Sequence, residues 1–164
     1  MSSKWPKAGP NFAPSYQVSG IPFVTSSLSD TEVPSDTGGA GSAFPIEVHF
    51  PYVTKNIKIR NTGGNALKVA FTFTGSFDPG QTYGTGDAKP IINGFNRNYF
   101  LIPAAAAGKS DTQDFDVRCK AVYLLGDGGT TGFSLYAGLT NITTASFPTI
   151  TGSYQGVTAF EGVG

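Results

Sequence analysis

The sequence predicts an all-β fold, an eight-stranded antiparallel sandwich of the single jelly-roll kind. Phenylalanine and tyrosine are abundant, with 13 Phe and 7 Tyr, and such residues suit a pleated, half-buried surface. The 22 Gly and 11 Pro supply the turns between strands. Apolar and polar residues also alternate in short runs, which is the period of two expected for strands with one buried face. At 164 residues, the chain has the size of one domain.

Residues 1–14 are predicted to form an extended N-terminal arm, because their prolines exclude helix and interrupt strand pairing. Trp5 and Phe12 are too hydrophobic for a fully solvated tail. We therefore expect the arm to fold back on its own domain or to pack on a neighbour. Residues 15–164 are predicted to form the jelly-roll domain.

Eight runs have strand character, each ended by turn residues. They are residues 16–26, 44–50, 56–61, 67–74, 98–102, 112–125, 133–139 and 150–160. Alternation predicts that Phe44 and Phe50 share an inward face, as do Phe71 and Phe73. Residues 112–125 are long enough for one bent strand, in which Phe115 opposes Asp114 and Asp116.

Glycine, serine and aspartate mark the connections between these runs. The loop over residues 27–43 is predicted to be most flexible from Ser35 onward, where the sequence reads Ser-Asp-Thr-Gly-Gly-Ala-Gly. Residues 61–65 are predicted to be a hairpin-type loop and residues 126–129 a tight turn, while 75–97 form a long excursion. An immunoglobulin-like sandwich is the main alternative fold, but it would be shorter and would not need such long loops.

Charged residues make up 13% of the chain, against about 25% in an average soluble protein. Eleven acidic and eleven basic residues give a net charge of zero. Either the surface is coated with Ser, Thr, Asn and Gly, or neighbouring copies and partners cover much of it. Neutrality argues against a nucleic-acid partner, which would require clustered Lys and Arg. The most basic stretch (Lys55, Lys58, Arg60 and Lys68) is interpreted as a solvated or partner-facing strand face.

The residues needed for familiar catalytic or metal sites do not occur in recognisable patterns, so we predict no catalytic residue, cofactor or metal. The single histidine, His49, lies on the polar face of a run beside Glu47 and is expected at a surface or an interface. The single cysteine, Cys119, is expected to be a buried strand thiol, and one Cys with one His cannot form a typical zinc site.

The densest acidic cluster contains Asp111, Asp114 and Asp116. It lacks the spacing of a calcium-binding loop. Asp114, Asp116 and Arg118 share one face of the predicted strand, so salt bridges among them are the simpler interpretation.

The N-terminal residues lack the apolar core of a signal peptide, and no run of 18 apolar residues occurs. We therefore expect no membrane span and a protein made or assembled in the cytosol.

Several stretches resemble the small single-jelly-roll capsid proteins, penton or minor, of large icosahedral DNA viruses that infect algae. The first is Pro14-Ser-Tyr-Gln-Val-Ser-Gly-Ile-Pro-Phe-Val-Thr-Ser-Ser27. The second is Val48-His-Phe-Pro-Tyr-Val-Thr-Lys-Asn-Ile-Lys-Ile-Arg-Asn61. The last two are Asp116-Val-Arg-Cys-Lys-Ala-Val-Tyr-Leu124 and Ser134-Leu-Tyr-Ala-Gly-Leu-Thr-Asn-Ile142. The likeness covers most of the chain and rests on strand patterns.

The resemblance implies a vertex subunit that assembles as a cyclic pentamer in an icosahedral shell, with other capsid proteins as further partners. It implies a location in the virion after assembly in the host cytoplasm, and no small-molecule substrate. The Lys58/Arg60 face and the Asp114/Asp116 face are candidate complementary contacts between copies. Trp5 and Phe12 are candidate apolar anchors, because aromatic residues dominate interface energetics.

A β-sandwich module that binds carbohydrate or a receptor is the alternative function. Exposed aromatic side chains could stack on sugar rings, and Trp5, Tyr83 and Tyr154 are the candidates for exposure. This alternative predicts a stable monomer, whereas the capsid hypothesis predicts a defined oligomer.

Overall fold

The computed structural model describes residues 22–36, 44–76, 98–105 and 111–146, together with the backbone of 149–154 and 157–163. The predicted arm 1–14, with Trp5 and Phe12, lies outside these residues. So do Tyr83, most of the long excursion 75–97, and the first part of the run 16–26.

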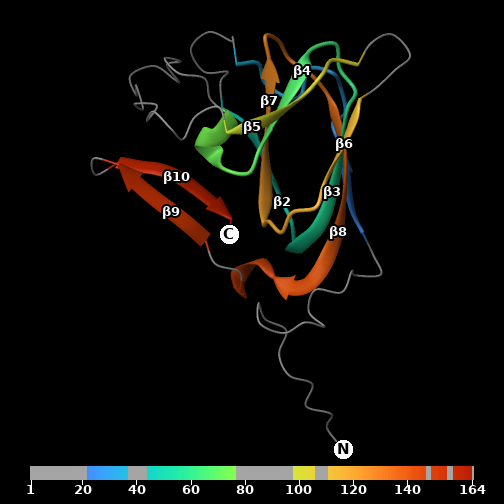
Figure 1. Cartoon of the computed structure of the whole chain (residues 1–164). Helices are drawn as coiled ribbons and strands as arrows, with labels where there is room; N and C mark the ends of the chain where they lie inside the picture. The colour runs from blue at the N-terminus through green and yellow to red at the C-terminus, as the bar shows by residue number, and fades with distance from the viewer. Residues whose placement is uncertain are drawn as a thin grey trace, which may run out of the picture.

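Two antiparallel four-stranded sheets dominate the described chain, which confirms the all-β prediction (Figure 1). One sheet has the order β1-β8-β3-β6, and the other has the order β2-β7-β4-β5. The first sheet consists of β1 (Phe23–Ser26), β8 (Phe133–Thr143), β3 (Tyr52–Asn61) and β6 (Thr112–Phe115). The second consists of β2 (Ile46–His49), β7 (Ala121–Asp127), β4 (Ala66–Ala70) and β5 (Tyr99–Ile102). Short 3-10 helices, η2 (Phe73–Ser76) and η3 (Thr144–Ser146), are the helical elements of this part of the chain.

The strand pairs are nested along the sequence. The first strand pairs with the eighth, the second with the seventh, the third with the sixth and the fourth with the fifth. The chain thus pairs like one long hairpin that turns back between β4 and β5. Additional pairing of β3 with β8 and of β4 with β7 joins these ribbons into the two sheets.

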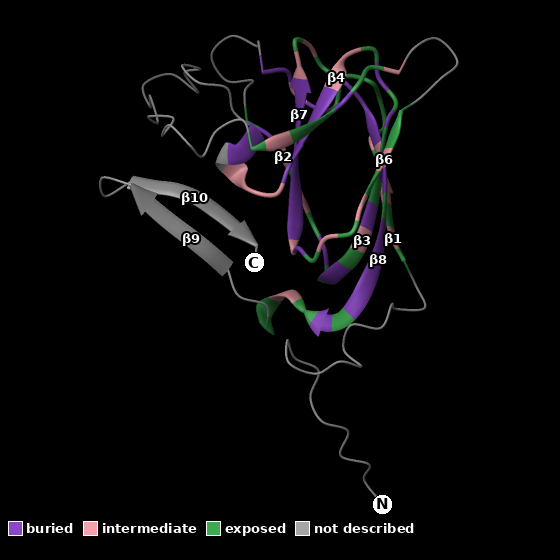
Figure 2. Cartoon of the chain, in the orientation of Figure 1, coloured by how far each residue is buried: buried purple, intermediate pink, exposed green. Residues whose placement is uncertain are grey.

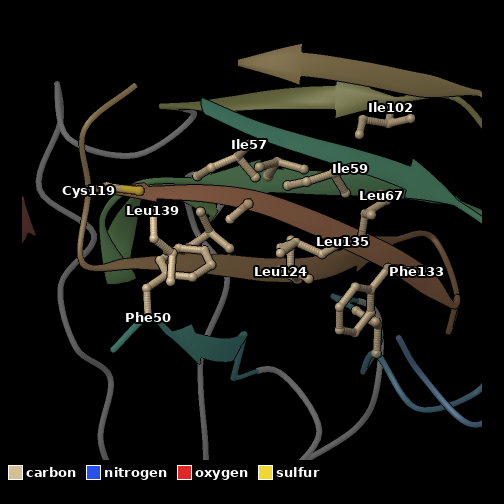
Figure 3. Close-up of a cluster of buried hydrophobic side chains, with 14 residues drawn as sticks. Phe50, Ile57, Ile59, Leu67, Ile102, Cys119, Leu124, Phe133, Leu135 and Leu139 are labelled. Atoms are coloured by element: carbon tan, nitrogen blue, oxygen red, sulfur yellow. The ribbon is translucent and has the colours of Figure 1, made fainter. Parts of the chain in front are cut away.

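The two sheets bury their inner faces against each other (Figure 3). Alternate residues of β3, such as Ile57 and Ile59, point inward and are fully buried. Leu67 and Val69 of β4 and Leu124 of β7 belong to the same cluster. Burial of each large aliphatic side chain contributes about 1.5–3 kcal/mol, so this shared core is the main source of stability.

The run 112–125, predicted as one bent strand, forms two strands in different sheets. β6 ends at Phe115, and β7 begins at Ala121. Thr54 of β3 organises the crossing between them: its hydroxyl donates to the carbonyl of Val117 (2.7 Å) and accepts from the N–H of Cys119 (3.0 Å). These bonds satisfy backbone groups of the connecting segment, which has left the ladder of one sheet and has not yet joined the ladder of the other.

The run 67–74 ends earlier than predicted. β4 stops at Ala70, and Phe73 lies in η2. Its ring stacks on Phe44 and meets the edge of Tyr123, with ring centroids 6.1 Å apart in both pairs. Phe44 and Phe73 therefore do not join the inner core as alternation predicted, whereas Phe50 does.

The run 150–160 also differs from its prediction. It spans two paired strands, β9 (Thr149–Tyr154) and β10 (Val157–Val163), which form a separate two-stranded sheet. Gln155 and Gly156 separate them in the sequence, and glycine is typical of short hairpin connections. The sandwich therefore has the predicted number of strands, but the run 112–125 supplies two of them and the run 150–160 supplies none.

The loop 61–65, predicted to be hairpin-type, instead connects the two sheets, because β3 and β4 do not pair. The buried amide of Asn61 holds it. Its Nδ2 donates to the carbonyls of Asn65 (2.8 Å) and Pro103 (2.9 Å), while its Oδ1 accepts from Gly63 N–H and the Thr131 hydroxyl. The turn after β7 agrees with its prediction, since Gly128 has a φ of 73°, a conformation that favours glycine.

In the part of the chain that the structure describes, no helix has the length and apolar character needed to cross a membrane.

Replacing Leu124 with alanine should lower the free energy of unfolding by about 2–5 kcal/mol, because it leaves a cavity between the sheets. Leu28→Ala is the matched control, since that leucine is 97% exposed. Its expected effect is within about 0.5 kcal/mol. Urea denaturation of both variants measures the difference, and equal effects would contradict the assignment of Leu124 to the core.

Candidate functional site: an open sheet face

The outer faces of the two sheets differ in exposure (Figure 2). On the β2-β7-β4-β5 sheet, the outward positions of the two central strands are buried, namely Lys68 and Ala70 of β4 and Tyr123 and Leu125 of β7. The edge strands of this sheet do expose outward residues, namely Glu47 and His49 of β2 and Leu101 of β5. In Figure 2, β4 and β7 are accordingly purple along most of their length. The outer face of the β1-β8-β3-β6 sheet instead presents side chains to solvent along all four strands, and we call this surface the open face.

Strand register aligns four exposed side chains in one row across the open face. Val24 of β1 lies opposite Tyr136 of β8, Tyr136 lies opposite Lys58 of β3, and Lys58 lies opposite Asp114 of β6. Val24 is 64% exposed and Tyr136 40%. The row therefore passes from an apolar end to a charged end.

The neighbouring row consists of Ser26, Ser134, Arg60 and Thr112, paired in the same way. The hydroxyl of Ser26 donates to that of Ser134 at 2.9 Å. The open face thus combines apolar, hydroxyl, cationic and anionic groups, which is the mixed composition of a non-obligate interface.

The predicted charged contacts lie on this face, but in a different arrangement from the one expected. Lys58 and Asp114 form a cross-strand ion pair within the chain, with Nζ and Oδ1 3.4 Å apart. Arg60 lies opposite Thr112, and Asp116 follows the end of β6 in the connection to β7, where it is exposed. The side chains of Lys58 and Asp114 are 54% and 68% exposed, so their pairing contributes at most about 1 kcal/mol.

Val24 and Tyr136 were not predicted as surface contacts, although alternation carried the signal. Phe133, Leu135 and Ala137 face the core, so Tyr136 must face outward. The aromatic residues predicted to be exposed were others: Trp5 and Tyr83 lie outside the described chain, as does the side chain of Tyr154.

His49 is at the surface, as predicted. Its side chain is 73% exposed, and its Nε2 lies 3.3 Å from Oε1 of Glu47. Glu47 also accepts a hydrogen bond from the hydroxyl of Tyr123 (2.8 Å).

Lys55, Lys58 and Arg60 of the basic stretch are exposed, as predicted. Lys68 is fully buried, which contradicts the interpretation of this residue as part of a solvated or partner-facing strand face. Its Nζ lies 2.6 Å from Oδ2 of Asp36 and 3.1 Å from Oδ1 of Asp127. Asp36 was predicted to lie in the most flexible part of the loop 27–43, which begins at Ser35, yet its N–H donates to the carbonyl of Gly126 and its Oδ1 accepts from the N–H of Gly128. Burial raises the pKa of Asp36, but the hydrogen bonds from Lys68 and Gly128 and the charge of Lys68 outweigh burial and hold it below its ordinary value.

Among the residues that the structure describes, no cluster contains three or more His, Cys, Asp or Glu placed to hold a metal ion. Asp111, Asp114 and Asp116 therefore do not form such a cluster there.

Cys119 is buried, as predicted, although it lies in the β6–β7 connection and not in a strand. Burial raises the pKa of its thiol to about 11, although hydrogen bonds from Thr54 and Ala121 act in the opposite direction. Both burial and the raised pKa keep the reactive thiolate scarce at neutral pH.

We expect Cys119 to resist a thiol reagent in the native protein at pH 8 and to react on unfolding. Because its folded pKa lies above the unfolded value, its contribution to stability is intact at neutral pH and is lost as the pH rises from about 8.5 towards about 11. Reaction with a chromogenic disulfide in increasing urea measures the first effect. A native thiol that reacts as fast as the unfolded one would contradict the burial. Cys119→Ala is the control for the alkaline loss of stability.

No protein-family model, curated protein or solved structure matches this chain. The fold and the open face are therefore the basis for inferring function.

Proposed function

We propose that this protein is a structural capsid subunit, a penton that assembles with copies of itself as a cyclic pentamer at the vertices of an icosahedral viral shell. The observation that carries the proposal is the contrast between the two outer sheet faces. One has buried outward residues on its central strands β4 and β7 and exposes residues at its edge strands, while the other presents Val24, Tyr136, Lys58 and Asp114 in a continuous row across all four strands.

We further infer that the eight sandwich strands form a jelly roll. The four nested pairs support this, because a jelly roll is a long antiparallel ribbon wound into two sheets. Each successive connection from β1 through to β4 crosses to the other sheet, and so does each successive connection from β5 through to β8. The consecutive strands β4 and β5 lie in the same sheet.

The open face has groups for both affinity and orientation. Tyr136 and Val24 supply apolar area that neighbouring copies can remove from water, and buried tyrosines are frequent interface anchors. Lys58, Arg60 and Asp114 supply both charge signs on this face, and Asp116 adds a negative charge in the adjoining β6–β7 connection. Such charges set register more than affinity. A ring requires that this face meet a different face of the next copy, since head-to-tail contacts close into cyclic oligomers.

The composition supports the same function. A charge content of 13% and a net charge of zero suit a subunit whose surface is covered by neighbours more than a freely dissolved monomer. In this proposal the partners are other copies and other capsid proteins, and Trp5 and Phe12 of the arm anchor one subunit to the next. Assembly takes place in the host cytoplasm, and the protein then resides in the virion.

One observation favours the alternative, a β-sandwich module that binds carbohydrate or a receptor. Tyr52 and Tyr136, both in the β1-β8-β3-β6 sheet, are 42% and 40% exposed. Exposed aromatic rings on a rigid sheet are suitable platforms for stacking on sugar rings. A monomer that binds glycans through these tyrosines would support this alternative.

The native mass of the full-length chain, measured by light scattering over a range of concentrations, tests the proposal. We expect a fivefold mass that is lost when residues 1–14 are removed and that is weakened by Lys58→Glu. The charge-swapped double variant Lys58→Glu/Asp114→Lys restores the ion pair within the chain while it inverts the charges offered to a neighbour. It should therefore remain defective in assembly.

Asp30→Lys, an exposed charge reversal in the β1–β2 connection, is the control and should assemble normally. Recovery of the oligomer in the charge-swapped variant would show that Lys58 and Asp114 act only within the subunit. A monomer at every concentration would contradict self-association and make a glycan screen the next experiment.

A further inference from the structure

The ammonium group of Lys68 lies between two carboxyl groups beneath the outer surface of the β2-β7-β4-β5 sheet. Its neighbours Leu67 and Val69 face the core, so Lys68 faces the other way, yet its side chain is fully buried. Nζ lies 2.6 Å from Oδ2 of Asp36 and 3.1 Å from Oδ1 of Asp127. The Tyr99 ring covers Nζ at 4.9 Å from its centroid.

The Asp36 carboxyl group is held from both sides. Its Oδ1 accepts a hydrogen bond from the N–H of Gly128 at 2.8 Å, while its Oδ2 faces the amine. Backbone contacts fix the residue itself: Asp36 N–H donates to the carbonyl of Gly126, and Ser35 forms a bridge with the same glycine. An amine and a carboxyl carbon are thus kept together with little freedom, which is the arrangement that accelerates intramolecular reactions.

Proton transfer is the chemical requirement for a reaction between these groups. An ammonium ion is not a nucleophile, and a carboxylate is a poor electrophile. Burial favours the neutral amine–acid pair, because both charges lose hydration. The hydrogen bonds and the Lys68 charge that lower the pKa of Asp36 favour the ionic pair, so the reactive neutral pair is the minor form. The 2.6 Å contact is the path for a proton from Nζ to Oδ2.

We propose that Lys68 and Asp36 condense to form an intramolecular amide bond. After the proton moves from Nζ to Oδ2, the neutral amine attacks Cγ of Asp36, and the negative charge that develops on Oδ1 is stabilised by the N–H of Gly128. Asp127 takes a second proton from Nζ and delivers it to Oδ2, which leaves as water. One C–N bond forms, one C–O bond breaks, and one water molecule is released, with no oxidant or other reagent.

The amide would tie the β1–β2 connection to β4 across 32 residues of sequence. The chain has a single cysteine and cannot form an internal disulfide. A lysine–aspartate cross-link would restrict the unfolded chain in the way a disulfide does, without dependence on redox conditions. This inference concerns the single subunit and does not rest on the proposed capsid function.

Tryptic mapping of the full-length protein, digested after denaturation, provides the test because an ion pair does not survive denaturation and an amide does. The cross-link blocks cleavage after Lys68, and Lys89 precedes a proline that also prevents cleavage. We therefore expect a branched product that joins residues 8–55 to residues 61–97 and is lighter than the two peptides by one water molecule.

Asp127→Asn, which keeps the shape but removes the proton acceptor, should reduce the fraction of branched product. Lys68→Met should abolish it. Lys58→Met, which breaks the exposed Lys58–Asp114 pair, is the matched control and should leave the branched product unchanged. The result on the wild-type chain is decisive even if a variant fails to fold.

Separate peptides 8–55 and 61–68 at full mass, after prolonged incubation of the folded protein, would overturn the proposal. Loss of water within the peptide 121–164 alone would also overturn it, because this would mark cyclisation at Asp127-Gly128. A branch from Lys68 to that same peptide would identify Asp127 as the reacting partner and would contradict the role of Asp36.

Discussion

Nested pairing of the strands is the constraint on which the other features of the structure depend. Because β1 pairs with β8, β2 with β7, β3 with β6 and β4 with β5, successive strands must cross between sheets to bury their apolar faces. The described segments 27–36, 62–65, 103–105 and 128–132 of the connections consequently meet at one end of the sandwich. Backbone groups in these crossings lack a ladder partner, and buried side chains such as Asn61 and Thr131 replace it.

Much of the inner core could be predicted from the sequence. Ile57, Ile59, Leu67 and Val69 alternate with polar or small residues, and their inward position requires only local information. The division between β6 and β7 could not be predicted in this way. The alternating pattern continues through Val117 to the buried Cys119, and the bonds that turn the chain come from Thr54, which is distant in sequence.

The candidate site shows the same limit. Lys58 and Arg60 were predicted to be exposed from their alternation, and the structure agrees for both. Lys68 belongs to the same basic stretch but is buried, because the tertiary structure places Asp36 and Asp127 beside its ammonium group. Local alternation carries no information on those two contacts. Alternation gives the two faces of a strand, but it does not show which outer face the rest of the chain will cover. That difference distinguishes the open face, which is proposed for assembly, from the buried centre of the other outer face, where the Lys68–Asp36 pair is proposed to react.

The contact between copies through the open face is most directly tested by lysine acetylation of the dilute and concentrated protein, read by mass spectrometry. Lys58 is the reporter on the open face, and Lys120, in the β6–β7 connection, is the internal reference. We expect the acetylation of Lys58 to fall relative to that of Lys120 as the native mass rises. An oligomer in which Lys58 is acetylated as readily as in the monomer would contradict it.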